Sequence, residues 1–237
     1  MSKNSVSKLR LEKMAEVQAL NENQQKAFDA WDNDCNLILN GSACTGKTYI
    51  AMAMAIEEVL ARRYRKVIVV RSVVPSRDIG FLPGKEDEKI EVYSRPYQAL
   101  ASEIFDDDRA AWMKLQAHDQ IQFECTSFVR GQTWDNCVVI VDEMQNLNAH
   151  ELDSVITRMG KGSRLILCGD YYQSDFTRRN ERDEKKGILE FLEVVRNMKG
   201  FAEIEFDHND IVRSELVKNY IIAKENMRRE GAITLDF

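Results

Sequence analysis

The stretch Leu37-Ile-Leu39-Asn40-Gly41-Ser-Ala-Cys-Thr-Gly46-Lys47-Thr48 decides the fold. The apolar run 37–39 has the composition of a buried strand, and the apolar residues from 48 to 56 indicate a helix packed closely on a sheet. Between them lies the pattern GxxxxGK(S/T), which is typical of a loop that binds phosphate groups. The alternative is a chance match, which the strand before and the helix after the loop argue against.

The residue types of this loop predict its chemistry. Gly41 and Gly46 let the backbone curl so that its N–H groups point at phosphate oxygens, and the following helix directs its positive end at the same anion. Lys47 would reach the β- and γ-phosphates and assist catalysis, and the Thr48 hydroxyl would ligate Mg²⁺. The predicted nucleotide-binding residues of the loop are Gly41, Ser42, Ala43, Cys44, Thr45, Gly46, Lys47 and Thr48.

A second motif is the acidic pair Asp142-Glu143, which ends the apolar run 138–141. In enzymes with such loops, a carboxylate here holds Mg²⁺ through its water shell, and an adjacent Glu can orient and deprotonate the attacking water. We therefore predict that Asp142 acts on the metal and Glu143 on the water. The alternative is a polar strand end without a chemical role. A glutamate base also favours phosphoryl transfer to water over transfer to a small acceptor.

Two glutamines occupy less specific positions. Gln173 follows the strand-like run that ends in Gly169-Asp170, where an amide beside the γ-phosphate can distinguish a triphosphate from a diphosphate. An ordinary turn between a strand and a helix accounts for these residue types equally well. Gln24 precedes the first strand, and its amide can pair with a donor and an acceptor on the exposed edge of adenine. For Gln24 the alternative is the solvated start of a helix.

Apolar runs alternate with helical patterns along the chain. We predict strands at 37–39, 66–70, 121–125, 138–141, 164–168 and 201–206, and helices at 21–31, 47–63, 149–158, 187–196 and 213–228. This alternation indicates an α/β fold, a mostly parallel sheet with helices on both faces. The 237 residues suffice for one such domain, so we predict a polar N-terminal extension, 1–20, and a single domain, 21–237. Ligands bind such sheets at the carboxyl ends of the strands, where the motifs lie.

Charge and composition restrict the function classes. The net charge of −6 argues against a protein that covers duplex nucleic acid with its whole surface, although a local basic strip or a ring lumen can bind a single strand. No segment has the apolar core of a signal peptide or the length of a membrane span. The five cysteines lack CxxC spacing. We therefore expect a soluble, cytoplasmic protein without a membrane partner.

Taken together, the motifs resemble those of the PhoH-like proteins, a family similar to the ATP-binding core of superfamily 1 helicases. The resemblance extends from about 24 to about 220 and departs from the usual family loop at Ser42 and Cys44, where Pro and Gly are common. The elements that carry it besides the loop are Gly80-Phe-Leu-Pro-Gly84, Phe128-Val-Arg130-Gly131, Asp142-Glu143-Met-Gln-Asn146, Thr157-Arg158-x-Gly160, Gly169-Asp170-x-x-Gln173-x-Asp175 and Ile211-Val-Arg213.

The resemblance implies a RecA-like P-loop NTPase domain that hydrolyses ATP with Mg²⁺, assembles into a homohexameric ring and acts on RNA or single-stranded DNA. In a ring, an arginine from one subunit can stabilise transition-state charge in its neighbour. Arg213 is the leading candidate, and Arg130, Arg178 and Arg179 are alternatives. The loop after the second strand, with Arg71, Ser72, Ser76 and Arg77, would contact nucleic acid, and Phe81-Leu82 would form a stacking face or a subunit contact.

Three other function classes share parts of this pattern. A small-molecule or nucleoside kinase has the phosphate loop but usually lacks the acidic pair, and no acceptor lid with arginines is evident. A GTP-dependent switch needs an Asn-Lys-x-Asp element, which the sequence lacks. A nucleotide-binding scaffold that does not hydrolyse its ligand would bind ATP without needing Glu143.

Overall fold

A six-stranded parallel sheet forms the centre of the protein. The computed structural model describes residues 7–72, 86–126, 131, 133–170 and 179–229. The strand order is β3-β2-β4-β5-β1-β6, and every pair of neighbours runs parallel. The strands are β1 (Asn36–Gly41), β2 (Lys66–Arg71), β3 (Ile121–Cys125), β4 (Cys137–Val141), β5 (Arg164–Gly169) and β6 (Phe201–Phe206). The predicted α/β fold is confirmed, and the domain is of the RecA-like P-loop type.

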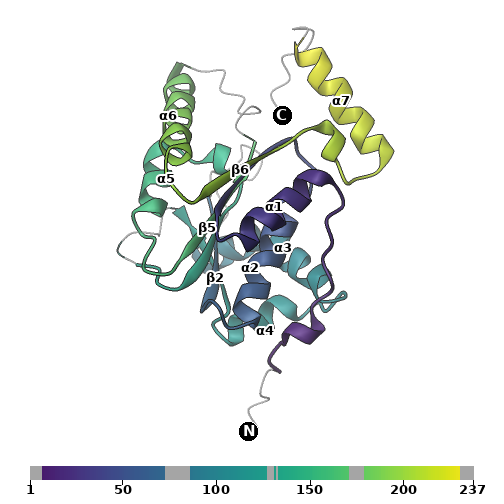
Figure 1. Ribbon diagram of the computed structural model, residues 1–237, viewed down its shortest axis with the longest axis vertical. Helices are drawn as coiled ribbons and strands as arrows, with labels where there is room; N and C mark the ends of the chain where they lie inside the picture. Colours follow the sequence, from purple (N-terminus) through teal and green to yellow (C-terminus); the bar gives the residue numbers. More distant parts are fainter. Residues whose placement is uncertain (1–6, 73–85, 127–130, 132, 171–178, 230–237) are drawn as a thin grey trace.

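Helices cover both faces of this sheet, as Figure 1 shows. Four of them share one face: α1 (Glu22–Asp32), α2 (Lys47–Leu60), α3 (Glu86–Ile104) and α4 (Ala111–Ala117). On the other face lie α5 (Ala149–Ile156) and α6 (Arg179–Arg196). Successive side chains of β1 point to opposite faces of the sheet. Leu37 and Leu39 pack with α2, and Ile38 packs with α5 and α6. All three are fully buried, which explains why the first strand reads as a continuous apolar run.

The sequence patterns are least informative for the connection between β2 and β3, which contains α3 and α4. The 19 residues of α3 include an internal proline, Pro96, which obscures the helical pattern because proline normally ends a helix. The predicted helix at 47–63 ends earlier, at Leu60, and the one at 187–196 begins earlier, at Arg179. The final strand, β6, is the outermost strand on one side of the sheet and pairs with β1. Its exposure alternates near its end, as predicted.

The described part of the N-terminal segment packs on the domain. Leu9 is buried, and Met14 and Val17 contact the same apolar core as α1 and α2. The backbone N–H of Ala15 donates to the carbonyl of Ile104 at the end of α3, at 2.8 Å. The short 3₁₀ helix η1 (Leu11–Lys13) lies within this segment. The proposed boundary at residue 20 therefore does not coincide with an edge of the core.

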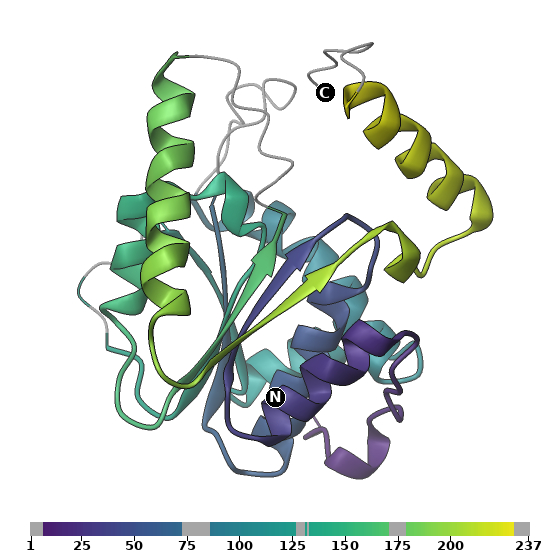
Figure 2. The ribbon, with the colours of Figure 1, turned by 45° about the horizontal axis from the view of Figure 1, so that its top comes forward.

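All six strands point their carboxyl ends at one edge of the sheet (Figure 2). In that view α6 rises beyond this edge on one side, and α7 (Glu215–Arg229) rises on the other. Two further 3₁₀ helices, η3 (Met144–Asn146) and η4 (His208–Asp210), follow β4 and β6 at this edge. Because β5 lies between β1 and β4, the loop after β1 and the acidic pair after β4 are separated by one strand, or about 10 Å. Within the described ranges, no helix is both long and apolar enough to cross a membrane.

Candidate nucleotide-binding site

The loop between β1 and α2 is shaped by two glycines with positive φ. Gly46 adopts the left-handed conformation, with φ of 84°, at the position that precedes the first residue of α2. Gly41 has φ of 123°, and a Cβ built on it would lie 1.9 Å from the carbonyl oxygen of Phe206 in β6. The next backbone N–H, that of Ser42, donates to the same oxygen at 3.0 Å. Gly41 is therefore required by the close approach of β6 as well as by the curl of the loop.

Lys47 points into the hollow of this loop. Its Nζ donates to the carbonyl oxygens of Gly41 and Ser42, at 2.8 and 2.6 Å, and lies 3.2 Å from the hydroxyl of Thr45. The Thr45 hydroxyl in turn donates to the carbonyl of Ser42, at 3.0 Å. Burial lowers the pKa of Lys47, although Cys168, Asp170, Glu143 and Asp142 act in the opposite direction. The loop thus holds a poorly hydrated ammonium group surrounded by hydrogen-bond acceptors of the protein. A bound anion could take the place of these acceptors.

Asp142 connects the end of β4 to the first turn of α2. Its Oδ1 accepts a hydrogen bond from the hydroxyl of Thr48, and its Oδ2 accepts one from the hydroxyl of Tyr97, each at 2.8 Å. Only 6% of Asp142 is exposed. Burial and the neighbouring Glu143 raise the pKa of Asp142, while the two hydroxyls act against that shift. The sheet and α2 therefore bring together the two residues that the sequence predicts as metal ligands.

Glu143 adopts a left-handed backbone conformation, with φ of 52°, where β4 gives way to η3. Its Oε2 accepts a hydrogen bond from Nε2 of Gln145 at 2.5 Å. Oε1 of Gln145 accepts from the backbone N–H of Asp170 at 3.0 Å, so this amide bridges the ends of β4 and β5. The sequence patterns assign no role to Gln145, although it lies in the quoted element 142–146.

A cavity of about 560 Å³ unites these groups. That volume lies in the ordinary range for small-molecule sites. Arg71, predicted to contact nucleic acid, lies in its wall at the end of β2. Burial opposes the charged form of Arg71, yet Tyr97, Glu143 and Asp142 raise its pKa overall. The described residues of the lining include Ala43, Cys44, Thr45, Gly46, Lys47, Thr48, Tyr49, Arg71, Tyr97, Asp142, Glu143, Gln145, Asp170 and Arg213.

A second cavity, of about 410 Å³, adjoins the outer side of the loop and shares Cys44, Gly46 and Tyr49 with the first. Gln24 lines it but is only 2% exposed. Its Nε2 donates to the carbonyl of Thr45 at 3.0 Å, and its Oε1 accepts from the backbone N–H of Leu20 at 2.9 Å. The amide predicted to pair with adenine thus makes hydrogen bonds to the protein backbone on both sides.

Arg213 lines both cavities of its own chain. The preceding residue, Val212, donates its backbone N–H to the carbonyl of Cys44 at 3.0 Å, which ties this segment to the loop. That Arg213 acts in a neighbouring subunit's site stays a prediction. Gln173 lies outside the described residues, as do Arg130, Arg178, Ser76, Arg77 and Phe81-Leu82.

The two loop residues that depart from the usual family pattern face different surroundings. Ser42 donates its hydroxyl to Oε1 of Glu225 in α7 at 3.1 Å, and it is not part of the lining of the larger cavity. Cys44 is exposed and has φ of 63°. This is a conformation in which glycine, the usual residue, meets no steric resistance. Neither substitution removes a backbone N–H from the loop.

The donor set at Thr48 and Asp142 fits Mg²⁺. Both donors are hard oxygens, and Mg²⁺ is typically held by one or two carboxylates together with water and the phosphates of its ligand. The described residues contain no group of three or more His, Cys, Asp or Glu side chains that could hold a metal ion.

A glycine-bearing loop between a strand and a helix, with a buried aspartate of a second strand hydrogen-bonded to the loop's threonine, defines a nucleotide-binding P-loop NTPase. A sequence profile of the PhoH-like protein family matches residues 16–225, and the chain belongs to this family. The resemblance seen in the motifs is thereby confirmed.

Curated relatives support the same assignment. A PhoH-like protein of Bacillus subtilis (strain 168) is 33% identical over 184 residues, which cover 77% of this chain and 56% of the relative. Protein PhoH of Escherichia coli (strain K12) is 32% identical over 212 residues, or 87% of this chain and 58% of the relative. The chain thus spans little more than half the length of these relatives.

Solved structures resemble the fold at low sequence identity. The large terminase of a thermophilic bacteriophage, in complex with ADP, has a TM-score of 0.48 at 13% identity, over 84% of this chain and 48% of its own. The Pif1 helicase of Candida albicans has a TM-score of 0.41 at 16% identity, over 90% of this chain and 44% of its own.

Proposed function

We propose that this protein hydrolyses ATP as its Mg²⁺ complex, with the phosphate chain bound in the loop 41–48. The observation that carries the proposal is the convergence of four groups on one cavity, namely the ammonium of Lys47, the hydroxyl of Thr48 and the carboxylates of Asp142 and Glu143. Each belongs to a residue type that phosphoryl transfer uses, and their shared cavity supports the roles proposed for them.

Lys47 would exchange its bonds to the carbonyls of Gly41 and Ser42 for bonds to the β- and γ-phosphates. A buried ammonium interacts more strongly with an anion than a solvated one, because the local dielectric constant is lower. Thr48 and Asp142 would hold Mg²⁺. When bound, this ion neutralises charge that develops on the phosphate oxygens.

Glu143 would accept a proton from the attacking water. Its carboxylate is held by Gln145, whose amide also bonds the backbone of Asp170, so the base is oriented by both strand ends. We assign Gln173, a few residues further on, to sensing the γ-phosphate. Arg213 would stabilise transition-state charge within its own subunit.

The adjoining 410 Å³ cavity is our proposed site for adenine. Gln24 would support its wall by joining Leu20 to Thr45, and any contact of the base would be with the remaining donor and acceptor capacity of that amide. The resemblance to the PhoH-like family further supports assembly into a homohexameric ring and action on RNA or single-stranded DNA in the cytoplasm.

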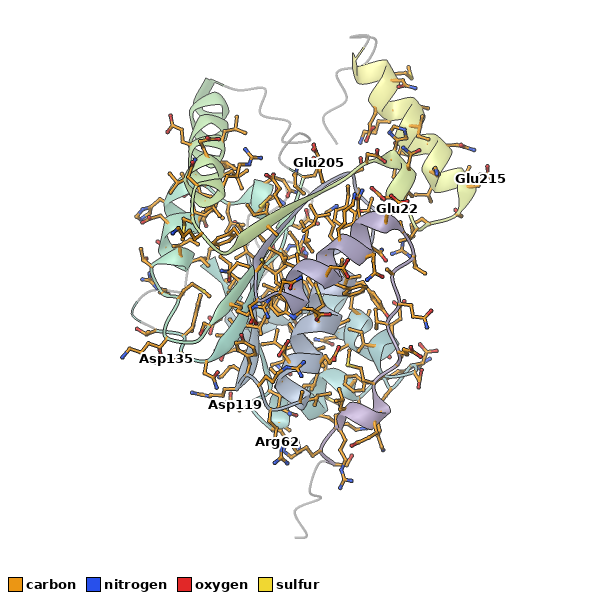
Figure 3. All side chains as sticks on the ribbon, in the orientation of Figure 1. Glu22, Arg62, Asp119, Asp135, Glu205 and Glu215 are labelled. Atoms are coloured by element: carbon orange, nitrogen blue, oxygen red, sulfur yellow. The ribbon has the colours of Figure 1, made fainter. Side chains whose placement is uncertain are left out.

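The decisive experiment measures inorganic phosphate released from Mg·ATP without any acceptor. We expect turnover by the unmodified protein and a loss of roughly 10²–10⁴-fold in kcat for Glu143→Gln, with ATP binding retained. Glu22→Gln is the matched control, because Glu22 is exposed at the start of α1 (Figure 3). Phosphate release that requires an added acceptor would indicate a kinase, and unchanged turnover in Glu143→Gln would remove Glu143 from the mechanism.

The coupling to nucleic acid and the ring are tested on the same sample. ATPase rates are compared with and without single-stranded RNA and DNA, and the mass of the assembly is measured in each condition. Full activity of a stable monomer that ignores both nucleic acids would contradict this part of the proposal.

A further inference from the structure

Tyr97 is a buried polar residue that neither the sequence motifs nor the proposed chemistry uses. It lies near the middle of α3 and is 1% exposed. Its ring packs against Phe123 of β3, with centroids 5.6 Å apart. Its hydroxyl donates to Oδ2 of Asp142 at 2.8 Å. A helix that packs beside β3, the outermost strand on one side of the sheet, thus brings its hydroxyl to Asp142, the predicted metal ligand.

The direction of this hydrogen bond follows from its neighbours. The charged guanidinium of Arg71 lies near the Tyr97 hydroxyl and acts on it electrostatically. An ionised carboxylate can only accept a hydrogen bond, so the phenolic proton of Tyr97 is directed at Asp142.

The two oxygens of Asp142 therefore have separate partners. Oδ2 is held by Tyr97 from α3, and Oδ1 faces Thr48 at the start of α2. A carboxylate anchored at one oxygen has its plane fixed, because rotation about the bond to the carboxyl carbon would break that hydrogen bond. The other oxygen is then aimed at the space next to the Thr48 hydroxyl.

We infer that Tyr97 is a positioning residue for Asp142, the predicted Mg²⁺ carboxylate. This inference rests on the proposed function, since it presupposes that Asp142 and Thr48 hold the ion. Partners that orient a metal ligand commonly contribute about 10–100-fold to metal affinity or activity.

The test is Tyr97→Phe, which removes the hydroxyl but keeps the ring that packs on Phe123. Binding of Mn²⁺ to the ADP-bound protein is measured by electron paramagnetic resonance of the free ion. We expect Mn²⁺ affinity to fall about 10–100-fold, while ADP affinity in EDTA is unchanged. Arg71→Met, which removes the positive charge near Tyr97 and Asp142, is expected to weaken Mn²⁺ binding in the same direction by a smaller factor.

Tyr93→Phe is the matched control. Tyr93 lies one turn earlier on the same helix and packs against the same core, but it is not among the described residues that line the larger cavity. We expect its Mn²⁺ affinity to equal that of the unmodified protein. Melting temperatures measured in EDTA establish that all the variants are folded.

Two results would overturn the inference. One is equal Mn²⁺ affinity in Tyr97→Phe and the unmodified protein. The other is a parallel loss of Mn²⁺ binding, metal-free ADP binding and melting temperature, which would show a role in packing alone. If the unmodified protein binds neither ADP nor Mn²⁺, the proposed function itself fails, and that outcome differs from both of these.

Discussion

Replacing Gly41 by alanine tests whether this glycine serves the fold or only the ligand. A Cβ at this position would lie 1.9 Å from the carbonyl oxygen of Phe206 and 2.8 Å from its carbonyl carbon, both backbone atoms that no side-chain rotation can move. The end of β1 and the end of β6 would have to separate. The Gly41→Ala variant should therefore be destabilised even when no nucleotide is present.

The magnitude follows from three contributions. Forcing an alanine into a positive φ costs roughly 1–2 kcal/mol. Overpacking against fixed atoms adds about 1–3 kcal/mol. The hydrogen bond from Ser42 to the Phe206 carbonyl, 3.0 Å in the unmodified protein, would be weakened, at about 1 kcal/mol. Gly200 offers a matched comparison, because it has φ of 82° but open space where a Cβ would lie, so only the first contribution applies.

The assay is thermal unfolding of both variants in EDTA. The difference of about 2–4 kcal/mol between Gly41→Ala and Gly200→Ala corresponds to roughly 4–16 °C in melting temperature for a domain of this size. Equal melting temperatures for the two variants would refute the reasoning, because they would show that β6 does not constrain Gly41. A normal melting temperature with lost ATP binding would assign the glycine to the ligand alone.

Two further predictions concern the charged groups of the site. Burial raises the pKa of Asp142 in the folded state above its ordinary 3.8, so the folded state binds a proton on this carboxylate more tightly than the unfolded state does. The free energy of unfolding therefore falls as the pH rises from the ordinary pKa through the raised one. The melting temperature of Asp142→Asn relative to the unmodified protein, in EDTA, should therefore increase from pH 4 to pH 7; a difference that is constant with pH would contradict this. If Arg213 acts within its own subunit, Arg213→Ala should lower kcat by up to roughly 10³-fold, and mixing this variant with Lys47→Ala before assembly should restore nothing. Activity of the mixture above the sum of its parts would place Arg213 in the neighbour's site.

Much of the fold and part of the site follow from local sequence patterns. The run 37–39 and the loop 41–48 are contiguous, so their strand, loop and helix depend on neighbouring residues and on glycine spacing. Asp142 and Glu143 were found because they end an apolar run, and parallel strands place such ends at one edge. The positions of Lys47, Thr48, Asp142 and Glu143 around one cavity were thus predictable.

The partners of these residues were not predictable, because they come from distant segments. Tyr97 meets Asp142 across 45 positions, and Ser42 meets Glu225 across 183. Gln24 illustrates a different limit, since an amide suited to adenine also suits two backbone groups, and only packing decides which partners it takes.

The sequence by itself determined the elements of the site: a phosphate loop, a threonine predicted to ligate metal, an acidic pair and the parallel sheet that carries them. Each of these is encoded in residues that are adjacent along the chain. The tertiary structure decided how those groups are held. The placement of β6 beside β1 leaves no room for a side chain at Gly41, and the packing of α3 against α2 and β3 brings Tyr97 to Asp142. These contacts depend on strand order and helix packing, which emerge only when the whole apolar core is assembled.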